Sequence, residues 1–389
     1  MKLALKSLAL AASCALVPLS AQAQQTIKIG LILPLSGPFA DYGNQINRGV
    51  KLYMQRNGDT IAGKKVELIV RDDTGVAPEL TKRLAQELVS NEKVDILAGF
   101  GLSPGALATA PLATAGKRPM VVMNAAASTL TTRSPNVVRV SHTLQQLSAP
   151  MATWAAKNGA DKIYTLVADY APGIDAETAF KKVYQATGKQ LIGEVRVPVN
   201  NIDFGPFVQR IKDARPNGVF LFLPPGEATI NFMKTWVERG MDRQGIKLLG
   251  TGDLTDDSLI EAIGKPAIGS ITAGHYSAAH DSALNKEYVG AYAREFGVKD
   301  RPNFMSVAGY DGMAAIYLAL KKTGGDPEVT KFMAAVKGLK WESPRGMISI
   351  DPETRDIVQT VYVRRTEMVD GKIYNVEFDK FTDQKDPGK

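Results

Sequence analysis

The chain has 389 residues, with 47 Lys and Arg, 40 Asp and Glu, 44% hydrophobic residues and one cysteine. This length and composition are typical of two or three compact globular domains, and they exclude wholesale disorder and fibrous repeats. The single cysteine excludes a disulfide framework, and with only three histidines in the chain we expect no metal site.

Residues 1–23 have the pattern of a cleavable signal peptide. Lys2 and Lys6 supply positive charge, residues 8–19 form a short apolar stretch, and Ala21-Gln22-Ala23 supplies the small residues of a cleavage site. The apolar stretch is too short to span a membrane. We expect export with cleavage after Ala23, and because both lysines are then lost the net charge falls from +7 to +5. This modest charge indicates no nucleic-acid partner.

After the signal, apolar runs alternate with amphipathic stretches of helix length. The first series predicts strand 27–33, helix 43–57, strand 66–70, helix 78–91 and strands 94–98, 120–123 and 137–140. The alternation then restarts, with helices 144–157, 176–185, 207–214 and 229–239 and strands 163–167, 191–197, 219–223 and 246–249.

The last third of the chain is richer in helix. Its pattern predicts helices 283–296, 306–322 and 329–337 and a strand at 348–350. A hairpin of strands 357–364 and 373–378 follows, turned at Asp370-Gly371.

Alternating strands and helices form parallel sheets with helices on both faces. Two such series predict an α/β fold of two doubly wound lobes, with short hinge crossings at 141–143, 273–276 and 343–346. We expect a signal peptide at 1–23, lobe 1 at 24–142 and 275–344, lobe 2 at 143–274 and 345–378, and a tail at 379–389. Ligands bind at the carboxyl ends of such strands, so we expect a site in the cleft between the lobes.

One segment resembles a catalytic motif. Gly101-Leu102-Ser103-Pro104-Gly105 matches G-x-S-x-G between a strand and a helix, as in an esterase. The oxyanion hole of that fold uses the N–H of the residue after the nucleophile, and Pro104 has none. A dinucleotide fingerprint also fails, because the third glycine of the Gly99-Phe100-Gly101 series comes one position late. We therefore expect no cofactor, and an esterase built on Ser103 is only the alternative class.

The same loop suits an anion. We expect Ser103 to be the N-cap of a helix with Pro104 at its first position, so that free helix N–H groups and the Ser103 hydroxyl point at a carboxylate. A second loop with small side chains follows the next strand and contains Asn124, Ala125, Ala126 and Ser128. The alternative is that both loops merely cap helices.

Residues 96–160 contain no Asp or Glu, whereas the chain average predicts roughly seven acids in that length. The same stretch contains five basic residues, Lys117, Arg118, Arg133, Arg139 and Lys157. A positive field over two helix starts favours an anionic ligand. A buried, acid-poor core is the alternative explanation for part of this pattern.

The second lobe is expected to supply the opposite wall of the cleft. Tyr170 lies at a strand end, and together with Phe100 it is predicted to flank a flat apolar slot. Asp253, at the end of another strand, is predicted either to accept a hydroxyl or ammonium or to cap a helix. Tyr276, near a crossing, is a further candidate ligand contact, whereas we expect its neighbours His275 and His280 to be structural.

Several motifs along the mature chain belong together. They are residues 29–37 (IGLILPLSG) with Gly43, 49–52 (GVKL), 68–73 (LIVRDD), 309–312 (GYDG) and 351–356 (DPETRD). In these motifs the chain resembles the leucine/isoleucine/valine-binding-protein-like family of periplasmic solute-binding proteins. The resemblance implies a two-lobed periplasmic protein with three crossings that closes on a small ligand and delivers it to the membrane permease of an ABC transporter. We expect a monomer.

The resemblance also implies which residues hold the ligand. Its carboxylate is expected at Ser103 and at the loop of Ala125, Ala126 and Ser128. The other lobe departs from the branched-chain amino-acid binders. Those proteins have a tyrosine where this chain has Gly173 and a second tyrosine near the position of Pro225. They also have a glutamate near the position of Gly252, which in this chain is followed by Asp253. The chain is also similar to the aromatic-acid binders of the family through residues 169–173, 250–254 and 341–346.

We therefore expect a non-enzymatic carrier for a small carboxylate, preferably an aromatic acid. The alternative ligand is a branched-chain or other hydrophobic amino acid. The alternative classes are a secreted esterase and a ligand-sensing module of a receptor.

Overall fold

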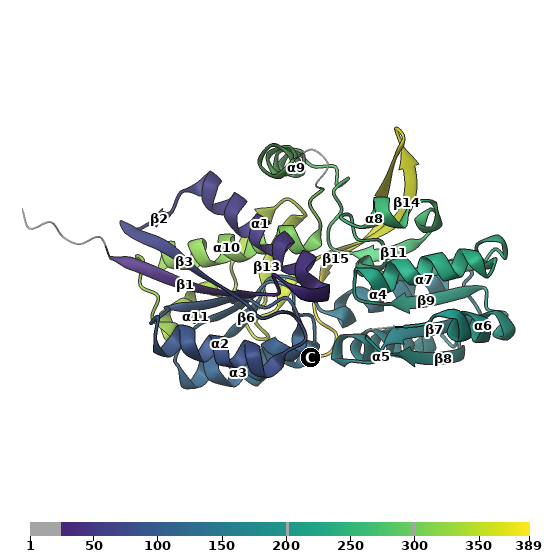
Figure 1. Cartoon of the computed structure of the whole chain (residues 1–389), viewed down its shortest axis with the longest axis horizontal. Coiled ribbons are helices and arrows are strands. Elements are labelled where there is room, and N and C mark those ends of the chain that lie inside the picture. The colour runs from purple at the N-terminus through teal and green to yellow at the C-terminus, as the bar shows by residue number, and fades with distance from the viewer. Residues whose placement is uncertain (1–24, 200–201, 298–300) are drawn as a thin grey trace, which may run out of the picture.

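The computed structural model describes residues 25–199, 202–297 and 301–389. The expected signal peptide lies outside these ranges. Figure 1 shows two lobes side by side along the long axis of the molecule, with the C-terminal end of the chain between them. Within the described ranges no helix is long and apolar enough to cross a membrane.

The sheet of lobe 1 has the strand order β2-β3-β1-β4-β5-β6. Its pairings are parallel except for that of β2 with β3. Ile29, Leu31 and Leu33 are fully buried, as expected for a continuous apolar strand inside a parallel sheet. The strands are β1 Thr26–Leu33, β2 Thr60–Ile61, β3 Lys64–Asp72, β4 Ile96–Gly99, β5 Met120–Val122 and β6 Val137–Arg139.

Helices cover both faces of this sheet (Figure 1). They are α1 Ala40–Asn57, α2 Pro78–Ser90, α3 Ser103–Ala115, α9 Ala283–Phe296, α10 Phe304–Lys322 and α11 Val329–Val336. Helices α1 and α10 cross at close range because each has a glycine at the contact. A Cβ at Gly49 would lie 1.9 Å from the Ser306 carbonyl oxygen, and a Cβ at Gly309 would lie 2.2 Å from that of Ile46. Both glycines belong to the motifs that carry the family resemblance.

The second sheet, most of which belongs to lobe 2, has the order β12-β13-β14-β11-β10-β9-β7-β8, and β15 also pairs with β14. The pairings among β8, β7, β9, β10 and β11 are parallel. The pairings of β14 with β11, β13 and β15, and that of β12 with β13, are antiparallel. The strands are β7 Ile163–Ala168, β8 Leu191–Val197, β9 Gly218–Phe222, β10 Lys247–Thr251, β11 Ile271–Gly274, β12 Lys340–Ser343, β13 Gly346–Ile350, β14 Ile357–Val369 and β15 Lys372–Gln384.

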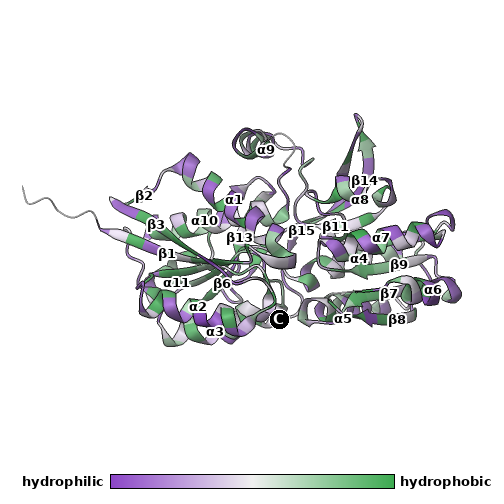
Figure 2. Cartoon of the chain, viewed as in Figure 1, coloured by the Kyte–Doolittle hydropathy of each residue, from purple (hydrophilic) through white to green (hydrophobic). Residues whose placement is uncertain are grey.

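The helices of lobe 2 are α4 Leu144–Lys157, α5 Ala171–Ala186, α6 Gly205–Ala214, α7 Glu227–Glu238 and α8 Ile260–Ile263. Figure 2 shows hydrophobic residues dominating the central strands of both lobes, whereas helices such as α2 and α7 carry residues of both kinds. This distribution is expected when helices lie between a buried sheet and solvent. The expected α/β fold with two lobes is therefore confirmed.

The predicted hairpin is present and longer than expected. Strands β14 and β15 are joined by the two residues Asp370 and Gly371, whose φ angles are +49° and +77°. Two central residues with positive φ are the signature of a type I′ turn, which matches the twist of the flanking strands.

Two details of the lobe boundaries differ from the prediction. Residues 379–384 form the second half of β15 rather than a tail, because the pairing with β14 continues to Gln384. Ile348, Ile350 and Ile357 pack in the buried cluster that contains the strands of lobe 1, although they were expected in lobe 2. The remaining assignment of residues to lobes stays a prediction.

The three expected crossings meet near the centre of the molecule. The ring of His142 in the first crossing stacks on that of His275 in the second, with centroids 4.7 Å apart. Arg345 in the third crossing is fully buried, forms an ion pair with Asp311 at 2.8 Å, and donates to the carbonyl oxygen of Ser141 at 3.1 Å. The crossing segments therefore hold one another directly.

Candidate functional site

Two adjoining voids lie where the lobes and the crossings meet. The first, which we call the cleft compartment, is narrow and has walls from both lobes. Its lining is Tyr42, Gly101, Leu102, Ser103, Asn124, Ala125, Ala126, His142, Leu144, Tyr170, Pro172, Phe222 and Asp253. The second, the hinge compartment, is smaller and is lined by His142, Leu147, Gly252, Asp253, Gly274, His275, Tyr276, Phe304 and Arg364. The two share His142 and Asp253, so they lie side by side and are treated together as the candidate site.

A wider hollow of about 750 Å³ lies at the edge of lobe 2, between Pro38 and Phe39 on one side and Phe204 and Pro225 on the other. It contains one charged lining residue, Glu227, and no basic group or serine hydroxyl. An anionic ligand therefore has better partners in the cleft compartment.

Ser103 joins the two loops that were predicted to hold an anion. The prediction that it is an N-cap is wrong, since α3 begins at Ser103, its N-cap is Leu102 and no side chain caps it. The Ser103 hydroxyl oxygen instead accepts the backbone N–H groups of Ala126 and Ala127, each at 3.1 Å. Its own proton is then directed elsewhere and suits a ligand carboxylate.

The second loop offers an anion fewer free donors than expected, because its amides already donate to protein oxygens. The amides of Ala126 and Ala127 donate to Ser103, and that of Ala125 donates to the Phe100 carbonyl at 3.0 Å. The Ser128 amide donates to Asp175 at 2.8 Å and its hydroxyl to Asp386 at 3.1 Å, and Ser128 lines neither compartment. The partial positive charge at the start of α3 remains beside the Ser103 hydroxyl.

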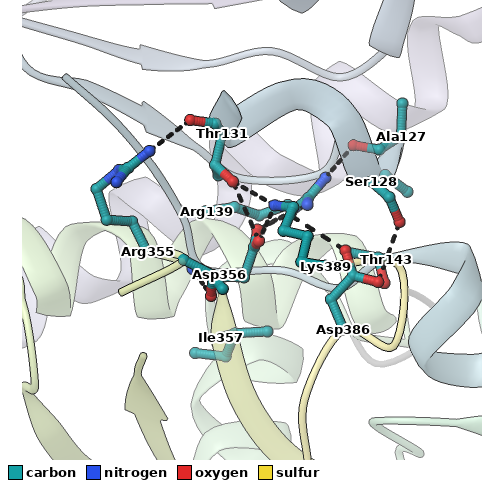
Figure 3. A network of polar contacts seen from close by, with 12 residues as sticks. Ala127, Ser128, Thr131, Arg139, Thr143, Arg355, Asp356, Ile357, Asp386 and Lys389 are labelled. Carbon is teal, nitrogen blue, oxygen red and sulfur yellow. Dashed lines mark hydrogen bonds and ion pairs between the residues drawn. The ribbon is translucent and has the colours of Figure 1, made fainter. Parts of the chain in front are cut away.

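Arg139 supports this loop from behind, as Figure 3 shows. Its side chain is fully buried, and it donates to the carbonyl oxygens of Ala125 at 3.2 Å and Ala127 at 2.7 Å. It also forms an ion pair with Asp356 at 2.6 Å, and Lys389 bonds to the same carboxylate. Arg139 therefore fixes the loop that in turn fixes the Ser103 hydroxyl.

The expected positive field is weaker than the acid-free stretch suggested. Arg139 is neutralised by Asp356, and Arg118 donates to the Val94 carbonyl. Lys117, Arg133 and Lys157 are exposed, and none of the five basic residues lines either compartment. Specific hydrogen-bond donors, rather than a general field, are therefore what the site offers an anion.

Aromatic rings form the walls of the cleft compartment. Tyr170 stacks on Phe222, with centroids 6.1 Å apart and ring planes 19° apart. On the opposite lobe, Tyr42 lines the compartment, and its hydroxyl donates to the Pro225 carbonyl across the cleft at 3.1 Å. Stacked and edge-on rings of this kind suit a flat apolar ligand. Tyr170 was predicted from the sequence, whereas Tyr42 and Phe222 were not.

Two predicted contacts lie outside the lining. Phe100 is 1% exposed and packs in the core beneath α3, because its φ of +65° turns the chain so that the ring faces inward. Gly173 also lines neither compartment, and a Cβ there would lie 1.8 Å from the Ala168 carbonyl oxygen, so no side chain fits. Pro225 borders the wider hollow instead and meets the site only through its bond from Tyr42.

Asp253 is the one acidic residue among the lining of both compartments. It is 6% exposed, and its Oδ2 accepts the Thr251 hydroxyl at 2.7 Å. Burial raises its pKa from the ordinary 3.8 to about 6, against the opposing effects of the Thr251 bond and of Arg364. Among the described residues no cation forms an ion pair with this carboxylate, so it can accept a hydrogen bond from a ligand.

Arg364 was not found from the sequence, although glycines mark its place. A Cβ at Gly252 would lie 2.8 Å from its Nη2, and one at Gly274 would lie 2.7 Å from its Cζ. The guanidinium thus occupies the space that a side chain at position 252 needs. It donates to the Thr272 hydroxyl from Nε and Nη2 and to the Tyr276 carbonyl from Nη1.

The lining does not favour a nucleophilic role for Ser103. Its oxygen accepts two N–H groups, which occupies its lone pairs. His142 lines the same compartment, but burial, with smaller effects from Arg139 and Arg345, lowers its pKa to about 3. A general base works best when its pKa lies near the working pH, so His142 is a poor base.

Comparisons with known proteins agree with this arrangement. A family model described as periplasmic binding protein matches residues 26–372. The Leu/Ile/Val-binding protein homolog 6 of Brucella melitensis is 43% identical over 388 residues, which cover 100% of this chain and 98% of the relative.

Two solved structures are also similar. The solute binding protein of an ABC transporter from Rhodopseudomonas palustris BisB5, in complex with 3,4-dihydroxybenzoic acid, is 55% identical with a TM-score of 0.90, covering 93% of this chain and 99% of that one. The solute binding protein from Rhodopseudomonas palustris HaA2, in complex with p-hydroxybenzoic acid, is 44% identical with a TM-score of 0.91, covering 94% and 99%. The expected family is confirmed, and the chain belongs to the periplasmic binding proteins, as a solute-binding component of an ABC transporter.

Proposed function

We propose that this protein binds an aromatic carboxylate between its lobes and delivers it to the permease of an ABC transporter. The observation that carries the proposal is the cleft compartment itself, which combines one hydroxyl donor at a helix start with aromatic walls. The carboxylate accepts a hydrogen bond from the Ser103 hydroxyl, and the ring lies between Tyr42 and the stacked pair of Tyr170 and Phe222. Asp253 lines both compartments, and we place it near the other end of the ligand.

The solved relatives support this ligand class. Both Rhodopseudomonas proteins were captured with hydroxybenzoic acids, and both cover nearly the full mature chain at 44% identity or more. The walls of the compartment suit such rings because they are flat and largely apolar.

A hydrophobic amino acid is the second candidate, since the Brucella relative is named a Leu/Ile/Val-binding protein homolog. A buried ammonium needs an acidic or carbonyl partner, or its desolvation costs several kcal/mol. Among the lining residues only Asp253 offers a carboxylate, and Gly252 offers no side chain. An aromatic acid has no such requirement.

Thermal melting separates these candidates. Benzoate and 4-hydroxybenzoate should raise the melting temperature of the purified mature protein, because binding to the folded state alone stabilises it. Leucine, isoleucine and valine at equal concentration should have little effect. A strong shift with leucine and none with either benzoate contradicts the aromatic assignment and favours the amino acid.

We also propose that the protein is an exported monomer without enzymatic activity, and that its lobes divide as expected outside the two corrected segments. Mass spectrometry of periplasmic protein should find Gln24 at the N-terminus, and light scattering should give the mass of one chain. Hydrolysis of nitrophenyl esters that is lost in Ser103→Ala would contradict the non-enzymatic assignment. If the purified protein binds the acid but a strain that lacks its gene takes up that acid as fast as wild type, the sensing role is favoured.

A further inference from the structure

The hinge compartment contains polar groups that the protein itself leaves unpaired. The rings of His142 and His275 stack with their planes 28° apart, and both line this compartment. Neither nitrogen of His275 has a hydrogen-bond partner among the described residues, nor has Nδ1 of His142. Both residues are only 2% exposed.

Such groups are costly unless something pairs with them. A buried donor or acceptor without a partner destabilises the folded protein, and most buried polar atoms in proteins are satisfied. The phenyl ring of Phe304 packs edge-on against both imidazoles, and it has no polar atom that could pair with their nitrogens. A ligand group that enters the compartment can satisfy them.

The charges in the compartment restrict what that group can be. Burial lowers the pKa of both histidines, to about 3 for His142 and well below the ordinary value for His275, so both rings are neutral at neutral pH. A neutral imidazole has one N–H donor and one bare acceptor nitrogen. Asp253 at the boundary provides a carboxylate acceptor, whereas Arg364 uses three of its five N–H groups on protein oxygens.

A hydroxyl group matches these partners better than other ring substituents. It donates one hydrogen bond to Asp253 and accepts one from an imidazole N–H. A second carboxylate would face the like charge of Asp253, and a bare ring would leave the imidazoles unpaired.

We propose that the hinge compartment is a subsite that recognises a hydroxyl on the ring end opposite the carboxylate, with His275 and His142 as specificity-determining residues beside Asp253. This inference rests on the proposed function, because it takes the ligand carboxylate to be bound at Ser103. It assigns the protein to hydroxybenzoates, as opposed to unsubstituted benzoates or benzene dicarboxylates.

Calorimetric titration of the mature protein at pH 7.5 with benzoate, 4-hydroxybenzoate and terephthalate tests the subsite. 4-Hydroxybenzoate should bind at least tenfold more tightly than benzoate, the scale of a hydrogen bond to a charged group. Terephthalate should bind no more tightly than benzoate. Equal affinity for benzoate and 4-hydroxybenzoate, or preference for terephthalate, would overturn the inference and leave the proposed function intact. If none of the three acids binds, both fail.

Two matched variants locate the effect. His275→Phe preserves a ring for the stack and removes both nitrogens, so the ratio of the benzoate Kd to the 4-hydroxybenzoate Kd should fall several-fold, toward one. His280→Phe is the control, because His280 pairs with Glu377 at 2.9 Å and lines neither compartment, so its ratio should match wild type. An unchanged ratio in His275→Phe would overturn the role of that residue. If His275→Phe lacks a cooperative melting transition, His142→Phe provides the same comparison.

Discussion

Replacement of Ser103 by alanine tests the carboxylate site and has two separable effects. The variant loses the acceptor for the amides of Ala126 and Ala127, which lie in a buried loop. A buried amide without an acceptor costs about 1–3 kcal/mol, so the free energy of unfolding should fall by about 2 kcal/mol or more. The variant also loses the hydroxyl donor to the ligand carboxylate, a bond worth about 1.5–3 kcal/mol, so the Kd should rise about 10–100-fold.

Calorimetric titration alongside urea unfolding measures both effects. Ser282→Ala is the matched control, because Ser282 is the N-cap of α9, accepts the Asn285 amide at 3.1 Å and lies outside both compartments. That variant should lose about 1 kcal/mol of stability and keep the wild-type Kd. If Ser103→Ala loses stability but binds 4-hydroxybenzoate as wild type does, Ser103 serves only to hold the loop, and the carboxylate is bound elsewhere.

Three further predictions concern acid stability, packing and closure. The pKa of Asp253 rises from 3.8 in the unfolded chain to about 6 in the folded one, so its contribution to stability is lost as the pH rises from 4 to 6. Ligand-free Asp253→Asn should therefore be more stable than wild type at pH 7, by about 3 kcal/mol at most, with the difference vanishing near pH 4; equal pH profiles in urea unfolding would refute this. Gly173→Ala should abolish or severely weaken folding, because its Cβ meets the Ala168 carbonyl at 1.8 Å, and a wild-type melting curve would contradict that packing. Opening of the lobes must break the bonds from Tyr42 to Pro225 and from Ser258 to Asp41, so small-angle scattering should show a smaller radius of gyration with ligand than without. An unchanged radius would indicate lobes that do not move.

The fold was predictable from the sequence because its signals are local. Continuous apolar runs such as residues 27–33 identify buried parallel strands, and Asp370-Gly371 identifies a hairpin turn. The N-cap assignment of Ser103 failed because the hydroxyl has a stronger use across the loops, with partners more than 20 residues away.

The site was predictable only in part, because much of it depends on long-range contacts. Arg139 pairs with an aspartate 217 residues away, and nothing near it in the sequence indicates that it supports a loop. Arg364 approaches the site beside Gly252 and Gly274. Of these two glycines only Gly252 was noticed in the sequence, as a departure from a family pattern. Phe100 was placed in the cleft by its position after a strand, and the positive φ that turns it into the core has no sequence signal beyond the adjacent glycines.

The central claim is that this periplasmic binding protein carries a hydroxylated aromatic acid. Calorimetric titration of the mature wild-type protein with 4-hydroxybenzoate and, separately, with leucine tests it most directly. We expect saturable one-to-one binding of 4-hydroxybenzoate and no measurable heat of binding with leucine at the same concentrations. One-to-one binding of leucine with no binding of 4-hydroxybenzoate would contradict it.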